Sequence, residues 1–163
     1  MKTLRTIGVY GFDRDSFLAA LKGAGVDLVL DVRQRRGVRG SEYAWANAQR
    51  LQATLAEAGI GYSHLKELAP TTEMRQLQYA EDAKLGEGKR NRTALAPAYV
   101  ERYTEEVLGR VDLGPVVQWI GNSSAALMCV ERDPEACHRS LIAERLEREH
   151  GFEVEHLRPT QLR

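Results

Sequence analysis

Apolar residues along this chain fall into short runs separated by longer amphipathic stretches. The short runs predict strands at 3–10, 26–32, 60–65, 125–130 and 152–157, and the first of them is rich in β-branched residues. The second and fourth of them are almost continuously apolar, as expected of strands that are covered on both faces of a sheet.

Helical patterns lie between these strands. The first begins with Asp13 or Asp15 as its cap and ends near Gly23. Further helices are predicted at 44–58, 71–84, 97–109 and from about 137 to 150, whereas 116–120 suits either a short helix or a strand.

This alternation predicts an α/β protein, a three-layer α/β/α sandwich with a mostly parallel sheet of about five strands. A chain of 163 residues suits a single α/β domain over 1–163. Right-handed crossovers would place the loops that follow the strands along one carboxyl edge of the sheet.

Charge and hydropathy narrow the function classes. The chain has 23 basic and 23 acidic residues, so any attraction for phosphate must come from local clusters. No apolar run approaches the roughly 20 residues of a membrane span, so we expect no membrane association and a cytoplasmic protein with free thiols. The motifs of phosphate-loop hydrolases, nicotinamide dehydrogenases and zinc proteases are absent from the sequence, and no cofactor is specified.

The segment 126–140 carries the densest chemistry. An apolar strand ends at Cys129, an acidic turn containing Pro134 follows, and a helix is expected to open around Cys137. His138 and Arg139 come directly after the second cysteine. Ligands of open α/β sheets usually bind at such strand-to-helix junctions.

Several segments occur in an order that resembles one known family. They are Thr-Ile-Gly at 6–8, Leu-Val-Leu-Asp-Val-Arg at 28–33, Gly-Ile-Gly-Tyr-Ser-His-Leu at 59–65, Ala-Leu-Met-Cys-Val-Glu at 126–131, Cys-His-Arg-Ser-Leu-Ile-Ala at 137–143 and Val-Glu-His-Leu at 154–157. The series resembles the bacterial and archaeal family called Domain of Unknown Function 488, also written DUF488.

The resemblance implies an α/β/α fold and one pooled site. The family's motif positions correspond to Asp31, Arg33, His64, Cys129, Glu131, Cys137, His138 and Arg139. Two places differ from the commoner pattern: Val9-Tyr10-Gly11 follows Gly8 where many relatives have His-Ser, and Leu65-Lys66-Glu67-Leu68 follows His64 where many have a proline. A role that rests on the missing histidine is therefore not carried over.

The first interpretation of this site is anion binding. A helix N-terminus offers unpaired N–H groups, and Arg33, Arg139 and Ser140 are the candidate anion-binding residues. The competing interpretation is structural: Asp133 caps the helix and Arg139 pairs with a nearby glutamate.

Catalytic roles are predicted for three residues of the same segment. Cys137 is the candidate nucleophile because a helix N-terminus and neighbouring cations lower the pKa of a thiol. His138 is the acid–base candidate and Glu131 an orienting carboxylate. Cys129, which ends a buried strand, has a supporting role, as do His64 and Asp31, the latter orienting an arginine.

A metal site is a weaker alternative. Cys129, Cys137 and His138 are donors that zinc accepts, with Glu131 or His64 as the fourth. Against it, adjacent residues on a helix, here Cys137 and His138, are expected to point in different directions.

A nucleic-acid interface is the third alternative. Its candidate residues form two basic loops: Arg35, Arg36 and Arg39 in the first, and Lys89, Arg90 and Arg92 in the second. Arginines beside Tyr43 and Trp45 could hold phosphates while stacking bases. The structural alternative is a solvated turn with both aromatic residues packed inside.

The sequence thus predicts a phosphate-binding site at the carboxyl edge of the sheet, for a nucleotide or another phosphate-bearing ligand, and an enzyme that acts on this ligand is one interpretation of it. A non-catalytic nucleic-acid-binding module and a Cys/His metal-binding protein stay open as alternatives, as does the question of enzymatic turnover.

Overall fold

The fold is an all-parallel five-stranded sheet with helices, as seen in a computed structural model that describes residues 2–88 and 91–159. The strand order is β3-β2-β4-β1-β5, and every neighbouring pair is parallel. The strands are β1 (Thr3–Ile7), β2 (Leu28–Asp31), β3 (Gly61–His64), β4 (Ala125–Met128) and β5 (Glu153–Leu157). The predicted mostly parallel α/β fold is confirmed.

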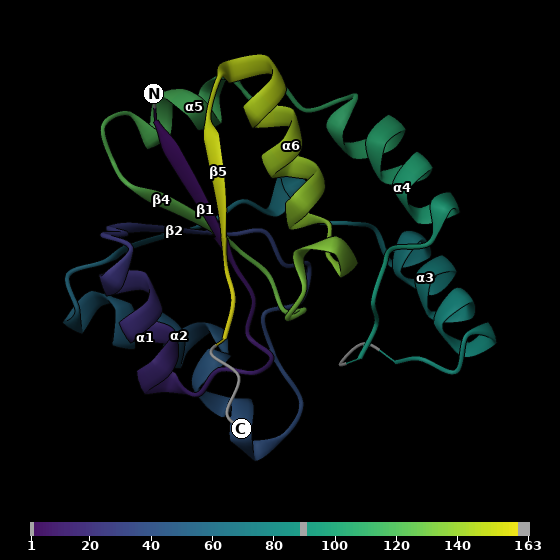
Figure 1. Ribbon diagram of the computed structural model, residues 1–163, viewed down its shortest axis with the longest axis horizontal. Helices are drawn as coiled ribbons and strands as arrows, with labels where there is room; N and C mark the ends of the chain where they lie inside the picture. Colours follow the sequence, from purple (N-terminus) through teal and green to yellow (C-terminus); the bar gives the residue numbers. More distant parts are fainter. Residues whose placement is uncertain (1, 89–90, 160–163) are drawn as a thin grey trace.

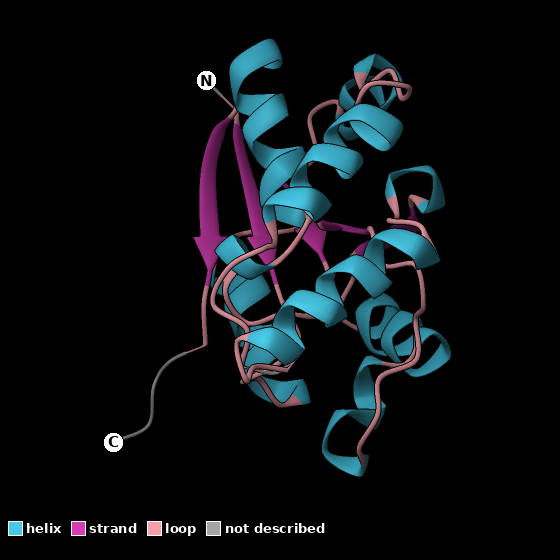
Figure 2. Ribbon diagram, turned by 90° about the vertical axis from the view of Figure 1, so that its right-hand side faces the viewer, coloured by secondary structure: helices cyan, strands magenta, loops and turns pink. Residues whose placement is uncertain are grey.

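Helices lie on both sides of this sheet. The α-helices are α1 (Arg14–Gly23), α2 (Ala48–Glu57), α3 (Thr72–Lys84), α4 (Pro97–Tyr103), α5 (Gly114–Ile120) and α6 (Arg139–His150). Figure 1 shows α1 and α2 on one side of the sheet and α3, α4 and α6 on the other. Figure 2, seen from the side of α3, α4 and α6, shows helices in front of the strands. No helix in the described ranges is long and apolar enough to cross a membrane.

Short helical turns refine the predicted boundaries. The 3₁₀ turns are η1 (Ser41–Ala46), η2 (Lys66–Leu68) and η4 (Pro134–Ala136), and η3 (Thr104–Leu108) is a π-helical turn that continues α4. The predicted helix over 44–58 is thus a 3₁₀ turn followed by α2. The undecided segment 116–120 is helical, as part of α5, which has proline in its first turn.

The start of α6 differs from the prediction in a way that matters for the site. The helix begins at Arg139, not around Cys137, because η4 intervenes. Cys137 itself is extended, with φ −138° and ψ 143°. The direction of its side chain is therefore not set by the geometry of an α-helix.

Local sequence explains the clearest helix start. Asp13 caps α1: its side chain accepts from the Ser16 backbone N–H, while the Ser16 hydroxyl accepts from the Asp13 N–H. This reciprocal capping box satisfies donors that would otherwise lack partners.

The strand order creates one crevice at the carboxyl edge. The chain leaves β2 toward β3, with α2 on one side of the sheet, and leaves β4 toward β5, with α6 on the other side. Neighbouring strands whose connections diverge in this way leave a gap between their loops, where ligands of open α/β sheets bind. The crevice between β2 and β4 is therefore the expected binding place.

Candidate functional site

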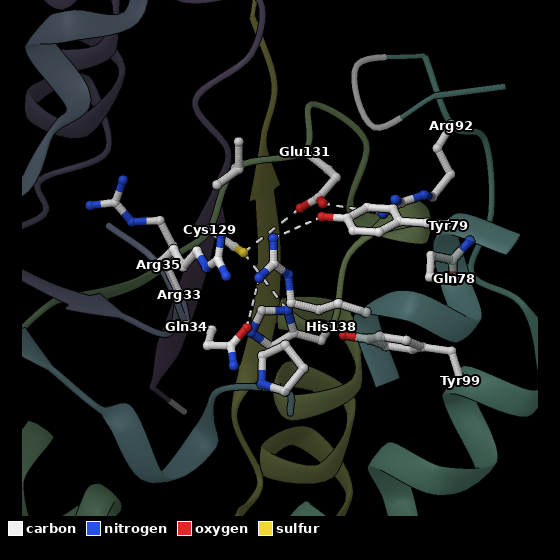
Figure 3. Close-up of a pocket in the computed structure, with 13 residues that line it drawn as sticks. Arg33, Gln34, Arg35, Gln78, Tyr79, Arg92, Tyr99, Cys129, Glu131 and His138 are labelled. Atoms are coloured by element: carbon white, nitrogen blue, oxygen red, sulfur yellow. Dashed lines mark hydrogen bonds and ion pairs between the residues drawn. The ribbon is translucent and has the colours of Figure 1, made fainter. Parts of the chain in front are cut away.

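A pocket occupies this crevice, and we call it the inner pocket. Its walls come from residues 33–35 after β2, residues 129–131 after β4, the face of α3 that carries Gln78, and His138 at the start of α6. Arg92 and Tyr99 of α4 complete its lining (Figure 3). The inner pocket is small, with a volume of about 40 Å³.

A second, wider cavity adjoins it, and we call it the outer pocket. Its volume is about 750 Å³, and it shares Arg35, Arg75, Tyr79 and Val130 with the inner pocket. Arg39 also lines it. The inner pocket admits a group the size of a few waters, whereas a larger molecule would have to extend into the outer one.

A buried ion pair supports the β2 side of the inner pocket. Arg33 donates from Nε and Nη2 to the two carboxylate oxygens of Asp31 at 2.9 and 2.7 Å, and from Nη1 to the Ala46 carbonyl. Both side chains are at most 1% exposed. Burial alone would lower the pKa of Arg33, but the hydrogen bond and charge of Asp31 outweigh it and raise that pKa. The positive charge of Arg33 is thus balanced by the carboxylate of Asp31.

A second buried network closes the opposite side. Arg92 pairs with Asp82 at 2.7 Å and with Glu131 at 3.2 Å. Burial would lower the pKa of Arg92, yet these carboxylates raise it. Arg92 therefore lies in the interior rather than on a surface that could meet nucleic acid.

Two other arginines of the inner pocket carry no carboxylate partner among the residues that the structure describes. Arg35 is exposed and makes no ion pair there. Arg75 donates to the neutral groups of Gln34 and Tyr79, both at 2.8 Å, and its guanidinium lies 5.6 Å from the Tyr79 ring centroid. Their charge is not cancelled locally.

Both cysteines and His138 meet at the floor of the inner pocket. Cys129 and Cys137 are free and buried. The Sγ atoms of Cys129 and Cys137 lie 3.7 and 4.0 Å from His138 Nδ1, and Cys129 also donates to Glu131 at 3.7 Å (Figure 3 shows the contacts of Cys129). Cys129 and His138 line the pocket, whereas Cys137 contacts them from outside the lining.

Electrostatics favour a charged thiol in this cluster. Burial would raise the pKa of Cys137, but the hydrogen bond with Cys129, the charge of Arg139 and the contact with His138 hold that pKa well below its ordinary value. Burial would likewise lower the pKa of His138, but Cys137 outweighs it and raises it. The pKa of the predicted nucleophile, Cys137, is thus lowered, whereas the thiol that lines the pocket is that of Cys129.

Tyrosines surround the cluster in their neutral form. Burial raises the pKa values of Tyr99 and Tyr103 well above the ordinary value. Tyr99 lines the inner pocket, and the Tyr103 ring lies 5.4 Å from that of His138. Tyr62, whose hydroxyl donates to Asp31, also has its pKa raised, chiefly by burial.

Arg139 and Ser140, predicted to bind the anion, lie behind the pocket. Arg139 is fully buried and donates to the backbone carbonyls of Glu131 and Arg132 and to the Thr6 hydroxyl. Ser140 donates to the Cys137 carbonyl at 2.8 Å. These contacts join α6 to the loop after β4, and neither residue lines the inner pocket.

The remaining predicted residues are dispersed. His64 lies 2.8 Å from the Arg33 carbonyl, outside the inner pocket, and Arg36 donates to the Tyr62 hydroxyl. Lys89 and Arg90 lie outside the described residues. Tyr43 packs on Tyr10, and Trp45 packs on Phe17.

Arg75, Gln78, Tyr79 and Tyr99 are among the lining residues that were not predicted from the sequence. The first three belong to α3, whose weak apolar periodicity gave little reason to assign it to a site. One signal was available, because Gln78 and Asp82 place polar groups four residues apart on a helix, and both are buried.

The backbone at Gly8 lies very close to the backbone of Glu131, which lines the inner pocket. A Cβ atom there would lie 1.9 Å from the Glu131 carbonyl oxygen, so the backbone after β4 would have to move. We expect Gly8→Ala to lower the free energy of unfolding by about 1–3 kcal/mol in urea denaturation. Gly23→Ala is the control, since a Cβ at Gly23 meets nothing within 4 Å. Equal stability of the two variants would contradict this close approach.

Comparison with family models decides the relationship. The model described as Domain of unknown function DUF488 matches residues 13–146. The chain belongs to the DUF488 family. The resemblance noted in the sequence is thereby confirmed over most of the chain. Searches of curated proteins and of solved structures find no match.

Proposed function

We propose that this DUF488 protein binds the oxyanion group of a small phosphate-bearing ligand, with Arg35 and Arg75 as the cations that hold it. The observation that carries the proposal is the charge pattern of the pocket. Arg33 and Arg92 are matched by carboxylates, whereas Arg35 and Arg75 have no carboxylate partner within residues 2–88 and 91–159. In a chain with equal numbers of acidic and basic residues, this local excess supports anion binding.

The shape of the two pockets supports a small molecule over a polymer. The oxyanion group would enter the narrow inner pocket, and the rest of the ligand would lie in the outer one, near Arg39. Of the residues proposed for nucleic acid, Arg92 is buried in ion pairs and Arg36 is bonded to Tyr62. The rings of Tyr43 and Trp45 are half-buried and pack on Tyr10 and Phe17, which favours the structural alternative for them.

Neutral donors would complete the anion site. The Gln34 amide lies beside the Arg75 guanidinium, and the Tyr79 hydroxyl accepts from it. This arrangement holds the guanidinium of Arg75 in place without cancelling its charge. Charged hydrogen bonds to an oxyanion contribute about 1.5–3 kcal/mol each.

We expect both Arg35→Ala and Arg75→Ala to weaken binding of inorganic phosphate by about tenfold or more, because each removes a charged hydrogen bond. Isothermal titration at low ionic strength measures this. Arg148→Ala, an exposed position near the end of α6, is the control and should bind as the wild type does. Sulfate and acetate, titrated in parallel, separate a tetrahedral oxyanion from a carboxylate. Wild-type affinity in both arginine variants would refute the proposal.

A further inference from the structure

We propose that Cys129, Cys137 and His138 form a zinc-binding site at the floor of the inner pocket. Their donor atoms all lie within 4.8 Å of one another, and all three residues are buried. Two thiolates and an imidazole are a donor set that selects a tetrahedral, borderline-soft ion such as Zn²⁺.

The distances fit a tetrahedral ion. Zinc–sulfur bonds of about 2.3 Å and zinc–nitrogen bonds of about 2.0–2.1 Å place a sulfur and a nitrogen about 3.6 Å apart at the tetrahedral angle. His138 Nδ1 is 3.7 Å from Cys129 Sγ and 4.0 Å from Cys137 Sγ. Both sulfur–nitrogen distances are thus within about half an ångström of the tetrahedral value. The two sulfur atoms, at most 4.8 Å apart, would have to come to about 3.8 Å, so modest side-chain shifts would bring the three donors onto one ion.

The backbone explains how adjacent residues converge. The sequence predicts that Cys137 and His138 point in different directions because it places both on a helix. That expectation is wrong, since Cys137 is extended and α6 begins one residue after His138. The chain turns between the two residues, and both donors approach Cys129 at the end of β4.

The imidazole is already oriented for a metal. His138 Nε2 lies 2.7 Å from the Val32 carbonyl oxygen, which can only accept. Nε2 must therefore carry a hydrogen, which leaves Nδ1 to face the two sulfur atoms. A backbone carbonyl on the far nitrogen is the usual support of a metal-bound histidine.

The fourth coordination position would open into the inner pocket. Cys129 and His138 line this pocket, and Glu131 Oε2 lies 3.7 Å from Cys129 Sγ. Glu131 Oε1 is engaged by Arg92, and the other predicted fourth ligand, His64, is outside the cluster. Three protein ligands with one open position are typical of catalytic zinc sites.

This assignment deepens the proposed function. Only the role of the open coordination position rests on that proposed function. A ligand oxyanion held by Arg35 and Arg75 would lie beside the ion, which could bind one of its oxygens. Zinc binding itself needs neither arginine, so the two proposals can fail separately.

Equilibrium titration of the chelator-treated full chain with Zn²⁺ against a competing chromophoric chelator tests the site. We expect one zinc per chain, and affinity lower by more than about 100-fold in both Cys137→Ser and His138→Ala, since loss of a second-shell partner alone costs about 10–100-fold. Glu144→Ala, on the exposed face of α6, should bind as the wild type does. Arg75→Ala should keep zinc while losing phosphate.

Two readouts on the wild type guard against variants that fail to fold. Cobalt(II) substitution should produce the strong visible bands of tetrahedral coordination with thiolate charge transfer. Zinc should also protect Cys129 from alkylation, and chelation should expose it. The site would be overturned if the protein bound no stoichiometric zinc or gave no such cobalt spectrum. It would also be overturned if zinc changed neither the alkylation of the cysteines nor their disulfide formation.

Discussion

Asp31→Ala is expected to lower the free energy of unfolding by about 3–5 kcal/mol, because it leaves the Arg33 guanidinium buried without its counter-charge. Asp31 accepts from Arg33 through both carboxylate oxygens and also accepts from the Tyr62 hydroxyl and the Arg33 N–H. Both side chains are almost fully buried, so bulk water would replace these contacts poorly. The expected loss is a large share of the roughly 5–15 kcal/mol that stabilise a typical domain.

Urea denaturation at neutral pH measures this loss. Glu144→Ala removes one partner of the exposed pair with Arg148 and should change the stability by less than about 1 kcal/mol. The double variant Asp31→Leu with Arg33→Met should be more stable than Asp31→Ala, because it removes the unpaired charge as well. If Asp31→Ala costs less than about 1 kcal/mol, the pair is not the buried support of β2 described above.

Arg139→Ala is expected to lower the melting temperature by about 6–12 °C while leaving phosphate affinity near that of the wild type. The side chain is fully buried, and its loss leaves the carbonyls of Glu131 and Arg132 without their donor. We expect a cost of roughly 3 kcal/mol, and a domain of this size loses about 2–4 °C for each kcal/mol. All contacts of Arg139 are internal, so we expect no direct effect on phosphate binding. If Arg139 bound the anion, as predicted from the sequence, its loss would lower the phosphate affinity instead.

Calorimetry and phosphate titration, at a temperature where the variant is folded, separate the two roles of Arg139. A stable Arg139→Ala protein with phosphate affinity lower by about tenfold would favour the sequence-based role. It would contradict the structural one. Arg148→Ala is again the matched control, as an exposed arginine of the same helix.

The fold was largely predictable because its signals are local. The apolar residues of β2 and β4 are buried on both faces of the sheet, and runs of that kind predict interior parallel strands. The order of the strands was not predictable, since the pairing of β4 between β1 and β2 joins segments far apart in the chain. Nothing in the local pattern encodes that choice.

The site was predictable only where it follows the sheet. Arg33 and Cys129 are brought together because the carboxyl ends of parallel strands share an edge, which the sequence pattern implies. Arg75 and Tyr79 reach the same pocket from α3, a helix whose place is set by tertiary packing. The sequence alone therefore could not assign Arg35 and Arg75 to the same anion site.

The burial of each side chain could also not be predicted from the sequence. Arg139 and Arg35 look equally suited to bind an anion, yet one is fully buried and the other is exposed. Whether an arginine has an internal acceptor depends on carbonyls contributed by other segments. Such contacts appear only when the chain is folded.

A crystal soaked in tungstate, a heavy tetrahedral oxyanion, would locate the anion directly. We predict one strong anomalous peak in the inner pocket, within hydrogen-bonding distance of the Arg35 and Arg75 guanidinium groups, and its loss in the Arg75→Ala crystal. A peak at another place on the surface, or no peak in the pocket at a concentration that saturates phosphate binding, would contradict the proposed anion site.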